Sequence, residues 1–437
     1  MKNLLVIAYY FPPSGGPGVQ RVLKHIKYLP EFGWNPIVLT VSNGTFPARD
    51  ESLFAEIPEG TIVERTTIYE PYTIYRKLTG KKPGTAIDVN NIKKEGQKMA
   101  WRDRISEFIR ATFFIPDARI GWILTANKAA VELVKKYDIQ AIYSSSPPYT
   151  CSLIGRNVQK QCNLPWIAGF RDPWTKFLTT PNRWFLPAMI DRHLEHSVFE
   201  RANAVECAWE GIIKDAIGKY PTLDLSKFFH VPNGFDSSDF PNEKYSKNDK
   251  FTVTYTGSMY GRRNPDSFFK AIQLLIDKNL IDKNKINLRF VGRFGNEVHE
   301  MFDNQSFKSS IEIIGYVTHH ESIAFLLKSE ALLLVVDEAK ESEEIVPGKV
   351  YEYVGVKRPI IAVAPQNSAI SDLIKETNSG RIAHQSQIEL IADIILDYYN
   401  DWNSATNNYN PNIDTINNYE RRNASKQLAE LLNKFGK

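Results

Sequence analysis

Short apolar runs alternate with amphipathic segments along the chain, and this alternation restricts the possible folds more than any other feature. An apolar run at 3–10 is followed by the loop "FPPSGGPG" at 11–18, a helical pattern and a second apolar run at 35–41. Strand, helix and strand in succession normally build a parallel sheet. The helical pattern repeats apolar residues at spacings of three and four, at Val19, Val22, Leu23, Ile26 and Leu29.

The alternation occurs twice. The segment 231–250, "VPNGFDSSDFPNEKYSKNDK", is rich in residues that favour turns and linkers, and a new strand pattern begins at 251 with "FTVTYTG". The sequence therefore predicts an α/β fold of two Rossmann-like, doubly wound domains in tandem. We expect one domain over 1–240 with an insertion at about 69–122, a second over 251–410 and a helical tail over 411–437.

Composition narrows the function classes. The 437 residues are 43% hydrophobic and carry a formal net charge of +4, far from the dense positive charge of a nucleic-acid binder. The cysteines, Cys151, Cys162 and Cys207, lack metal-site spacing and favour a reducing compartment. No secretory signal is visible, and no run reaches the roughly 18 apolar residues of a spanning helix. We expect a cytoplasmic protein that contacts a membrane, if at all, peripherally at its inner face.

An aromatic and basic segment, "WRDRISEFIRATFFI" at 101–115, allows two interpretations. Its apolar face is either an ordinary core-facing stripe or an interfacial element that meets a membrane or a lipid acceptor. We expect the core-facing stripe, with the interfacial element as the alternative. The face consists of Trp101, Ile105, Phe108, Ile109 and Phe113.

Two loops of the first half are candidate sites. Gly15 and Gly16 lie between a strand and a helix, where glycine lets backbone amides approach a phosphate; a tight turn is the alternative. In "GFRDPW", Arg171, Asp172 and Trp174 follow a strand, where α/β proteins bind ligands. A structural ion pair between the arginine and the aspartate is the alternative there.

The histidines make poor metal-site candidates. His193 and His196 share a helix face, but catalytic zinc usually needs about three protein ligands. The adjacent His319 and His320 point to different helix faces. We therefore expect no metal site.

The loop "YTGSMYGRRNPD" at 255–266 opens the second half. Gly257 ends the strand, and Arg262 and Arg263 stand before the helix that begins near Pro265. Cations in such a loop can neutralise a diphosphate as its charge develops. Two solvated surface arginines are the alternative.

The stretch "SEEIVPGKVYEYVG" at 342–355 sets Glu344 and Glu352 around a helix that we expect to begin at Pro347. Amides around Gly348, with Lys349 beside them and Val350 following, suit a diphosphate. The two acids would repel such an anion, so each is expected to accept hydrogen bonds from neutral hydroxyls on either side of it. A nucleotide sugar offers that arrangement.

These motifs together resemble the family 4 glycosyltransferases, which have the GT-B fold of two Rossmann-like domains. The resemblance rests on the Glu-x7-Glu element of Glu344 and Glu352, the N-terminal glycine-rich loop, "VPNGFD" and "YTGSMYGRRNP", in the family's order. It implies a retaining, metal-independent transferase that uses a nucleoside-diphosphate sugar of UDP or GDP type. We also expect the C-terminal helix to return to the N-terminal domain.

The resemblance also implies roles for individual residues. Glu352 would hold the ribose, Glu344 would lie near the donor sugar, and the amides around Gly348 would meet the phosphates. The leaving diphosphate would be stabilised by Arg262 or Arg263 and by the amides of Gly15 and Gly16. Asp172 resembles an acceptor-side residue. The chain departs from many relatives in having Asn264 and Pro265 after the arginines, where they carry a lysine.

The expected function is transfer of a sugar to a glycan or lipid-linked acceptor in cell-surface polysaccharide biosynthesis. Two alternatives remain open. One is a nucleotide-sugar 2-epimerase of the same architecture, and the other is a non-catalytic protein that binds nucleotide sugars. Either would share the two-domain fold, so the fold alone does not separate them.

Overall fold

The chain folds into two compact units, each built on a parallel sheet. The first comprises Met1–Asn233 and Arg421–Lys437, and the second comprises Gly234–Glu420. A computed structural model describes residues 1–46, 48–69, 101–177, 180–241, 246–261, 263–336, 346–406 and 408–436. The predicted α/β fold of two Rossmann-like domains is confirmed.

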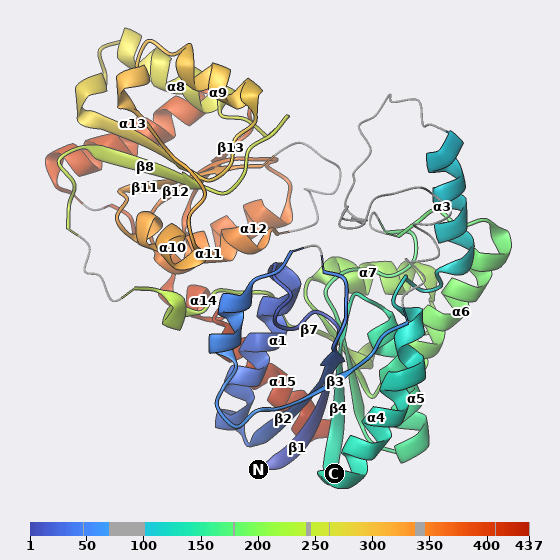
Figure 1. Cartoon of the computed structure of the whole chain (residues 1–437). Coiled ribbons are helices and arrows are strands. Elements are labelled where there is room, and N and C mark those ends of the chain that lie inside the picture. Colours follow the sequence, from blue (N-terminus) through green and yellow to red (C-terminus); the bar gives the residue numbers. More distant parts are fainter. Residues whose placement is uncertain are drawn as a thin grey trace. The chain divides into compact units, whose positions relative to one another are not determined.

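The first unit has a seven-stranded sheet in the order β3-β2-β1-β4-β5-β6-β7, with every neighbouring pair parallel. Helices cover both faces of this sheet (Figure 1). The strands are β1 (Lys2–Ala8), β2 (Trp34–Val41), β3 (Ile62–Thr66), β4 (Ile139–Ser146), β5 (Trp166–Phe170), β6 (Ala204–Cys207) and β7 (Phe228–His230). The helices are α1 (Pro17–Tyr28), α3 (Trp101–Phe113), α4 (Ile123–Lys136), α5 (Thr150–Cys162), α6 (Phe185–Arg201), α7 (Glu210–Lys219) and α15 (Arg421–Phe435).

The second unit repeats this winding with six strands in the order β10-β9-β8-β11-β12-β13. In each sheet the order reverses beside the first strand, which creates a switch point where such folds bind ligands. The strands are β8 (Phe251–Thr256), β9 (Ile286–Val291), β10 (Ile311–Ile314), β11 (Ala331–Val335), β12 (Ile360–Val363) and β13 (Gly380–Ala383). The helices are α8 (Asp266–Asp277), α9 (Asn296–Asp303), α10 (His319–Leu327), α11 (Gly348–Val356), α12 (Ala369–Thr377), α13 (Ile388–Ser404) and α14 (Ile413–Asn417).

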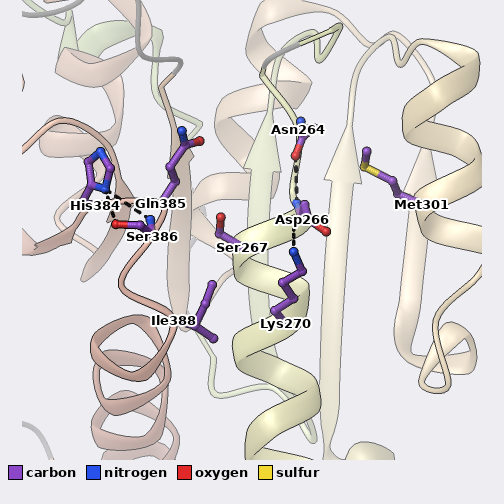
Figure 2. Close-up of a pocket in the computed structure, with 9 residues that line it drawn as sticks. All are labelled: Asn264, Asp266, Ser267, Lys270, Met301, His384, Gln385, Ser386 and Ile388. Carbon is purple, nitrogen blue, oxygen red and sulfur yellow. Dashed lines mark hydrogen bonds and ion pairs between the residues drawn. The ribbon is translucent and has the colours of Figure 1, made fainter.

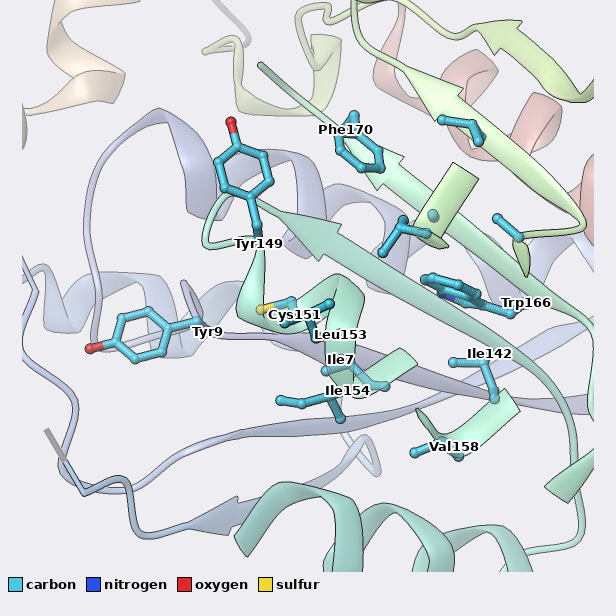
Figure 3. Close-up of a cluster of buried hydrophobic side chains, with 14 of the residues drawn as sticks. Ile7, Tyr9, Ile142, Tyr149, Cys151, Leu153, Ile154, Val158, Trp166 and Phe170 are labelled. Carbon is cyan, nitrogen blue, oxygen red and sulfur yellow. The ribbon is translucent and has the colours of Figure 1, made fainter. Parts of the chain in front are cut away.

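The apolar runs of the inner strands are continuous because these strands are buried on both faces. In β1, Leu5 and Ile7 belong to one buried cluster, whereas Leu4 and Val6 belong to the cluster on the opposite face. Alternate side chains of a strand point to opposite faces, so a strand covered by helices on both sides needs apolar residues at every position. Figure 3 shows the first of these clusters, which gathers side chains of several elements, among them Leu153 and Val158 of α5 and Ile142 of β4.

The C-terminal helix α15 belongs to the first unit, as predicted. Leu428 and Leu432 are buried in the same cluster as Leu4 and Val6 of β1. The indole Nε1 of Trp34 also donates a hydrogen bond to the side chain of Asn433, at 3.1 Å. The helix thus completes the face of the sheet that α1 covers.

A buried carboxylate joins four parts of the first unit. Glu206 of β6 accepts hydrogen bonds from Arg21 of α1 at 2.5 Å and from the Tyr143 hydroxyl of β4 at 2.7 Å. His25 lies 3.5 Å from the same carboxylate and bonds Ser425 of α15 at 3.0 Å. Burial alone would raise the pKa of Glu206, but the Arg21 guanidinium and His25 outweigh it and hold that pKa at about 2.

No helix within the described part of the chain is both long enough and apolar enough to cross a membrane.

We expect Glu206→Gln to destabilise the first unit by about 3–5 kcal/mol near pH 7, because it leaves the Arg21 guanidinium buried without its counter-ion. The change is measured by urea unfolding followed through tryptophan fluorescence. Every tryptophan except Trp402 precedes residue 234, so the signal reports mainly on this unit.

The effect also has a pH signature. The pKa of Glu206 is about 2 in the folded state against an ordinary value of 4.5, so its stabilisation is complete above pH 4.5 and is lost as the pH falls toward 2. The difference between wild type and variant should shrink over that window. Glu200→Gln, an exposed change on α6, is the matched control, and an equal loss in both variants would contradict the assigned role.

Candidate functional site

The loop after β8 presents bare backbone at the switch point of the second sheet. Gly257 has a φ of 115°, which favours glycine, and its N–H donates to the carbonyl of Val291 at 2.9 Å. A Cβ on Gly292 would lie 2.0 Å from the Gly257 carbonyl oxygen. Two glycines are therefore required where the loops after β8 and β9 meet: Gly257 for its backbone conformation, and Gly292 for the close approach of the two main chains.

Helix α11 begins beside this loop. Pro347 is its N-cap, with φ −60° and ψ 143°, so the helix starts at Gly348, one residue later than predicted. The Tyr353 hydroxyl accepts the N–H of Thr256 at 2.8 Å and so ties α11 to the carboxyl end of β8. Among the described residues, a Cβ on Gly348 would meet no atom within 4 Å, so they leave the space beside this residue open. Val350 is buried, and its N–H donates to the Pro347 carbonyl.

Lys349 directs its ammonium group at the end of β8. Its Nζ donates to the Tyr255 hydroxyl at 3.2 Å, stands 4.3 Å from the centre of that ring, and would lie 3.8 Å from a Cβ on Gly257. Burial and, to a smaller extent, the nearby charge of Arg263 together lower the pKa of Lys349 to about 7, while Glu352 opposes the shift. The two cations are close enough to repel, which favours an anionic ligand between or beside them.

Glu352 lies on the same helix, three residues after Lys349, and pairs with a histidine. Its Oε1 is 2.8 Å from the Nε2 of His319, the first residue of α10. Thr318 and Glu321 form a capping box that fixes the start of α10, and so places His319. Both side chains remain partly exposed, at 26% for Glu352 and 50% for His319, so the pair is accessible to a ligand.

Two of the predicted residues, Arg262 and Glu344, lie outside the described residues. Arg263 is described, and it is the cation whose charge acts on Lys349. Within the second unit the structure thus brings together Gly257, Arg263 and the first turn of α11.

In the first unit, the glycine-rich loop is held by Arg171. Its Nη1 donates to the Gly18 carbonyl at 2.5 Å, and its Nη2 donates to the carbonyl of Pro147. Gly16 has a φ of 95° and caps α1, so the turn itself needs glycine at that position. The N–H of Gly15 donates to the carbonyl of Ala48 at 3.0 Å, and a phosphate on this amide would compete with that bond.

Asp172 is half-buried, whereas Trp174 is fully buried. Burial raises the pKa of Asp172, and the Arg171 charge opposes the rise. Trp174 is fully buried: it stacks on Tyr149 with ring centres 4.7 Å apart, and its Nε1 donates to Asp191 at 2.8 Å. Its indole therefore supports the loop from the core and does not face solvent in this structure.

A separate pocket of about 630 Å³ lies between the N-terminus of α8 and the loop that precedes α13 (Figure 2). None of the residues predicted for the site lines it. It is lined by Asn264, Asp266, Ser267, Lys270, Met301, His384, Gln385, Ser386 and Ile388. Over the described ranges, no three His, Cys, Asp or Glu side chains gather as metal ligands would.

Part of the second unit matches a known protein family. Residues 236–413 match the family described as Glycosyl transferases group 1. This range contains the loop after β8, the pair of Glu352 and His319, and all of α11. No curated protein matches the chain.

The whole chain is similar in fold to solved GT-B proteins. The Anabaena protein Alr3699/HepE in complex with UDP is 14% identical, with a TM-score of 0.58 over 99% of this chain and 100% of that one. A glycosyltransferase from Rickettsia africae is also 14% identical, with a TM-score of 0.61 over 99% and 98%. A Listeria monocytogenes protein assigned as a UDP-N-acetylglucosamine 2-epimerase is 12% identical, with a TM-score of 0.54 over 100% and 97%. The chain has the GT-B fold, and its second unit matches the group 1 glycosyl transferases.

Sequence reasoning missed three side chains of this site. Tyr255, Tyr353 and His319 make the contacts that orient α11 and its charged groups. The capping pattern at Thr318 and Glu321 could have located the start of α10, and with it His319. No local sequence signal indicates that the Tyr255 hydroxyl accepts a hydrogen bond from Lys349, because the two residues are 94 positions apart.

We expect one lysine to titrate near pH 7. In a protein labelled at the lysine 13Cε positions, one NMR signal should shift with a midpoint of about 7 and should be absent from Lys349→Met. Arg263→Gln removes a repelling charge, so the midpoint should rise in that variant.

Lys270→Met, which removes an exposed lysine on α8, is the control and should leave the signal in place. If no lysine signal titrates below about pH 9, the environment assigned to Lys349 is wrong.

Proposed function

We propose that the protein is a glycosyltransferase that takes a sugar from a nucleoside-diphosphate donor of UDP or GDP type. The observation that carries this proposal is the meeting of Lys349 and Arg263 at the open first turn of α11, beside the bare backbone of Gly257. Two cations and a helix N-terminus suit a diphosphate. They lie within the segment that matches the group 1 family.

Glu352 and Glu344 bind the uncharged parts of the donor, which are the ribose and the sugar. Glu352 accepts hydrogen bonds from the ribose hydroxyls, and His319 orients its carboxylate from the far side at 2.8 Å. Glu344, which the family resemblance places near the donor sugar, accepts from the sugar hydroxyls. A nucleotide complex of a protein with the same fold, that of Anabaena Alr3699/HepE with UDP, supports this class of ligand.

The reaction breaks the bond between the anomeric carbon and the diphosphate oxygen. Negative charge then grows on the diphosphate, where Lys349, Arg263 or Arg262 and the amides near Gly348 stabilise it. A bound diphosphate also raises the pKa of Lys349, so the lysine is charged when the leaving group needs it. The acceptor oxygen attacks from the side the nucleotide leaves, which retains configuration without a catalytic metal, and its proton passes to the departing diphosphate.

The first unit supplies the acceptor side. Asp172 follows β5 at the carboxyl edge of its sheet, with Arg171 bracing the loop and Trp174 supporting it from the core. The acceptor is a glycan or a lipid-linked glycan of cell-surface polysaccharide assembly, and the protein works in the cytoplasm. The amides of Gly15 and Gly16 remain candidates for a phosphate contact.

Two other functions are testable alternatives. An epimerase of this fold would convert a nucleotide sugar without an acceptor, so incubation with the donor alone followed by analysis for an epimer separates it from a transferase. A non-catalytic binding protein would bind the nucleotide and release none from any pair of donor and acceptor. The family match of residues 236–413 favours the transferase over both.

We expect Glu352→Gln and Lys349→Met each to weaken binding of a nucleoside diphosphate by about tenfold or more, because each removes a charged hydrogen-bond partner of the ligand. Glu344→Ala should lower turnover more than it lowers nucleotide affinity. Binding is measured by calorimetry with UDP and GDP after a thermal-shift screen, and turnover by release of the nucleotide.

Glu389→Gln, an exposed acid on α13, is the matched control and should bind like wild type. The site assignment is refuted if Glu352→Gln and Lys349→Met both bind nucleotide normally. The absence of stabilisation by any nucleoside diphosphate would refute the donor class itself.

A further inference from the structure

Exposed apolar side chains gather on two helices of the first unit. The N-terminal half of α6 and the residue before it expose Trp184, Phe185, Leu186, Met189 and Ile190, with Phe185 80% exposed. Helix α3, which packs beside α6 (Figure 1), adds Phe108 and Phe113, the latter 68% exposed. We call these seven residues the α3–α6 face. Large apolar side chains exposed together on two packed helices are a feature of binding sites.

The α3–α6 face is rigidly built. The guanidinium of Arg183 donates to the carbonyls of Ala111, Phe114 and Pro116, at 2.7 to 2.8 Å, and pairs with the buried carboxylate of Asp191 at 2.7 Å. The Nε1 of Trp184 donates to the hydroxyl of Thr112 at 3.0 Å. The apolar side chains are thus held outward by a hydrogen-bonded frame, and their exposure is not the result of a loose helix end.

The charges around the face are mostly positive. Between 183 and 193 the single acid is Asp191, which is buried against Arg183, whereas Arg192 and His193 are exposed. Among the α3 side chains that the structure describes, Arg104 is exposed and Arg110 half-buried, and the acid beside them is the half-buried Glu107. An apolar centre with a basic rim complements a bilayer with anionic headgroups, where aromatic side chains favour the interface.

We propose that the α3–α6 face inserts into the surface of an anionic lipid bilayer. Phe108 and Phe113 do not face a core, whereas Ile109 of the same predicted stripe packs against the buried Phe114. The face on α6 could not be expected from periodicity, because α6 also buries Asp191, Glu195 and Phe199 on its other side.

The α3–α6 face is connected to the proposed acceptor loop. Asp191 of α6 accepts from the indole of Trp174, two residues after Asp172, and Arg183 holds the same carboxylate. A bilayer at this face would bring a lipid-linked acceptor to the element that carries Asp172. This last step rests on the proposed function, whereas contact with the bilayer does not.

The test is co-flotation of the full chain with vesicles. Wild type should float with vesicles of phosphatidylcholine and phosphatidylglycerol, and less with phosphatidylcholine alone. The triple variant Phe185→Ser, Met189→Ser, Ile190→Ser should lose more than about tenfold of its vesicle affinity, because it removes three apolar side chains from the contact. Leu124→Ser, at an exposed apolar residue of α4 that is 73% exposed, should bind like wild type.

Three outcomes overturn the proposal: no flotation of wild type, equal flotation of the triple variant, or an equal loss in Leu124→Ser. If the triple variant instead converts a dimer to a monomer, with vesicle binding unchanged, the face is a contact between two copies. Sedimentation measures that outcome. Nucleoside-diphosphate binding should be the same in wild type and triple variant, so its absence would refute the proposed function and leave vesicle binding to be judged separately.

Discussion

The first unit depends on one buried carboxylate. Glu206 has its charge compensated by Arg21 and is hydrogen-bonded by Tyr143, so β6, α1 and β4 are fixed at one point. Arg21 also donates to the carbonyls of Val231 and Pro232, at the end of this unit's first segment. A charged group in this position is costly unless each partner is present, which makes the arrangement of the surrounding elements specific.

In the second unit, by contrast, two neighbouring side chains, Lys349 and Arg263, carry charge of the same sign. Around α11, charges of the same sign lie close together: Lys349 sits over a tyrosine ring, feels the charge of Arg263 and has a pKa of about 7. Such crowding is unfavourable in the folded protein alone and becomes favourable when an anion binds. The network around Glu206 is therefore suited to stabilising the fold, whereas the charges around α11 are suited to binding a ligand.

A related contrast distinguishes the aromatic side chains of the first unit. Trp174, next to the candidate acceptor residue, is buried and stacked on Tyr149, whereas Trp184 and Phe185 a few residues later are exposed. Neither composition nor period predicts this difference, since all three lie in one aromatic stretch of the sequence. The hydrogen bonds of Arg183 decide it, because they fix which side of α6 meets the core.

The sequence by itself determined the two doubly wound halves, the return of the C-terminal helix through its resemblance to a known fold, and the helix start that carries Gly348, Lys349 and Glu352. These features depend on local patterns of apolar residues, glycine and proline, or on motifs kept in order. Only the tertiary structure decided that Lys349 meets Tyr255, that Glu352 meets His319 and that the α3–α6 face is exposed. Those contacts join residues far apart in the chain, and their partners follow from strand order and helix packing, which no local pattern encodes.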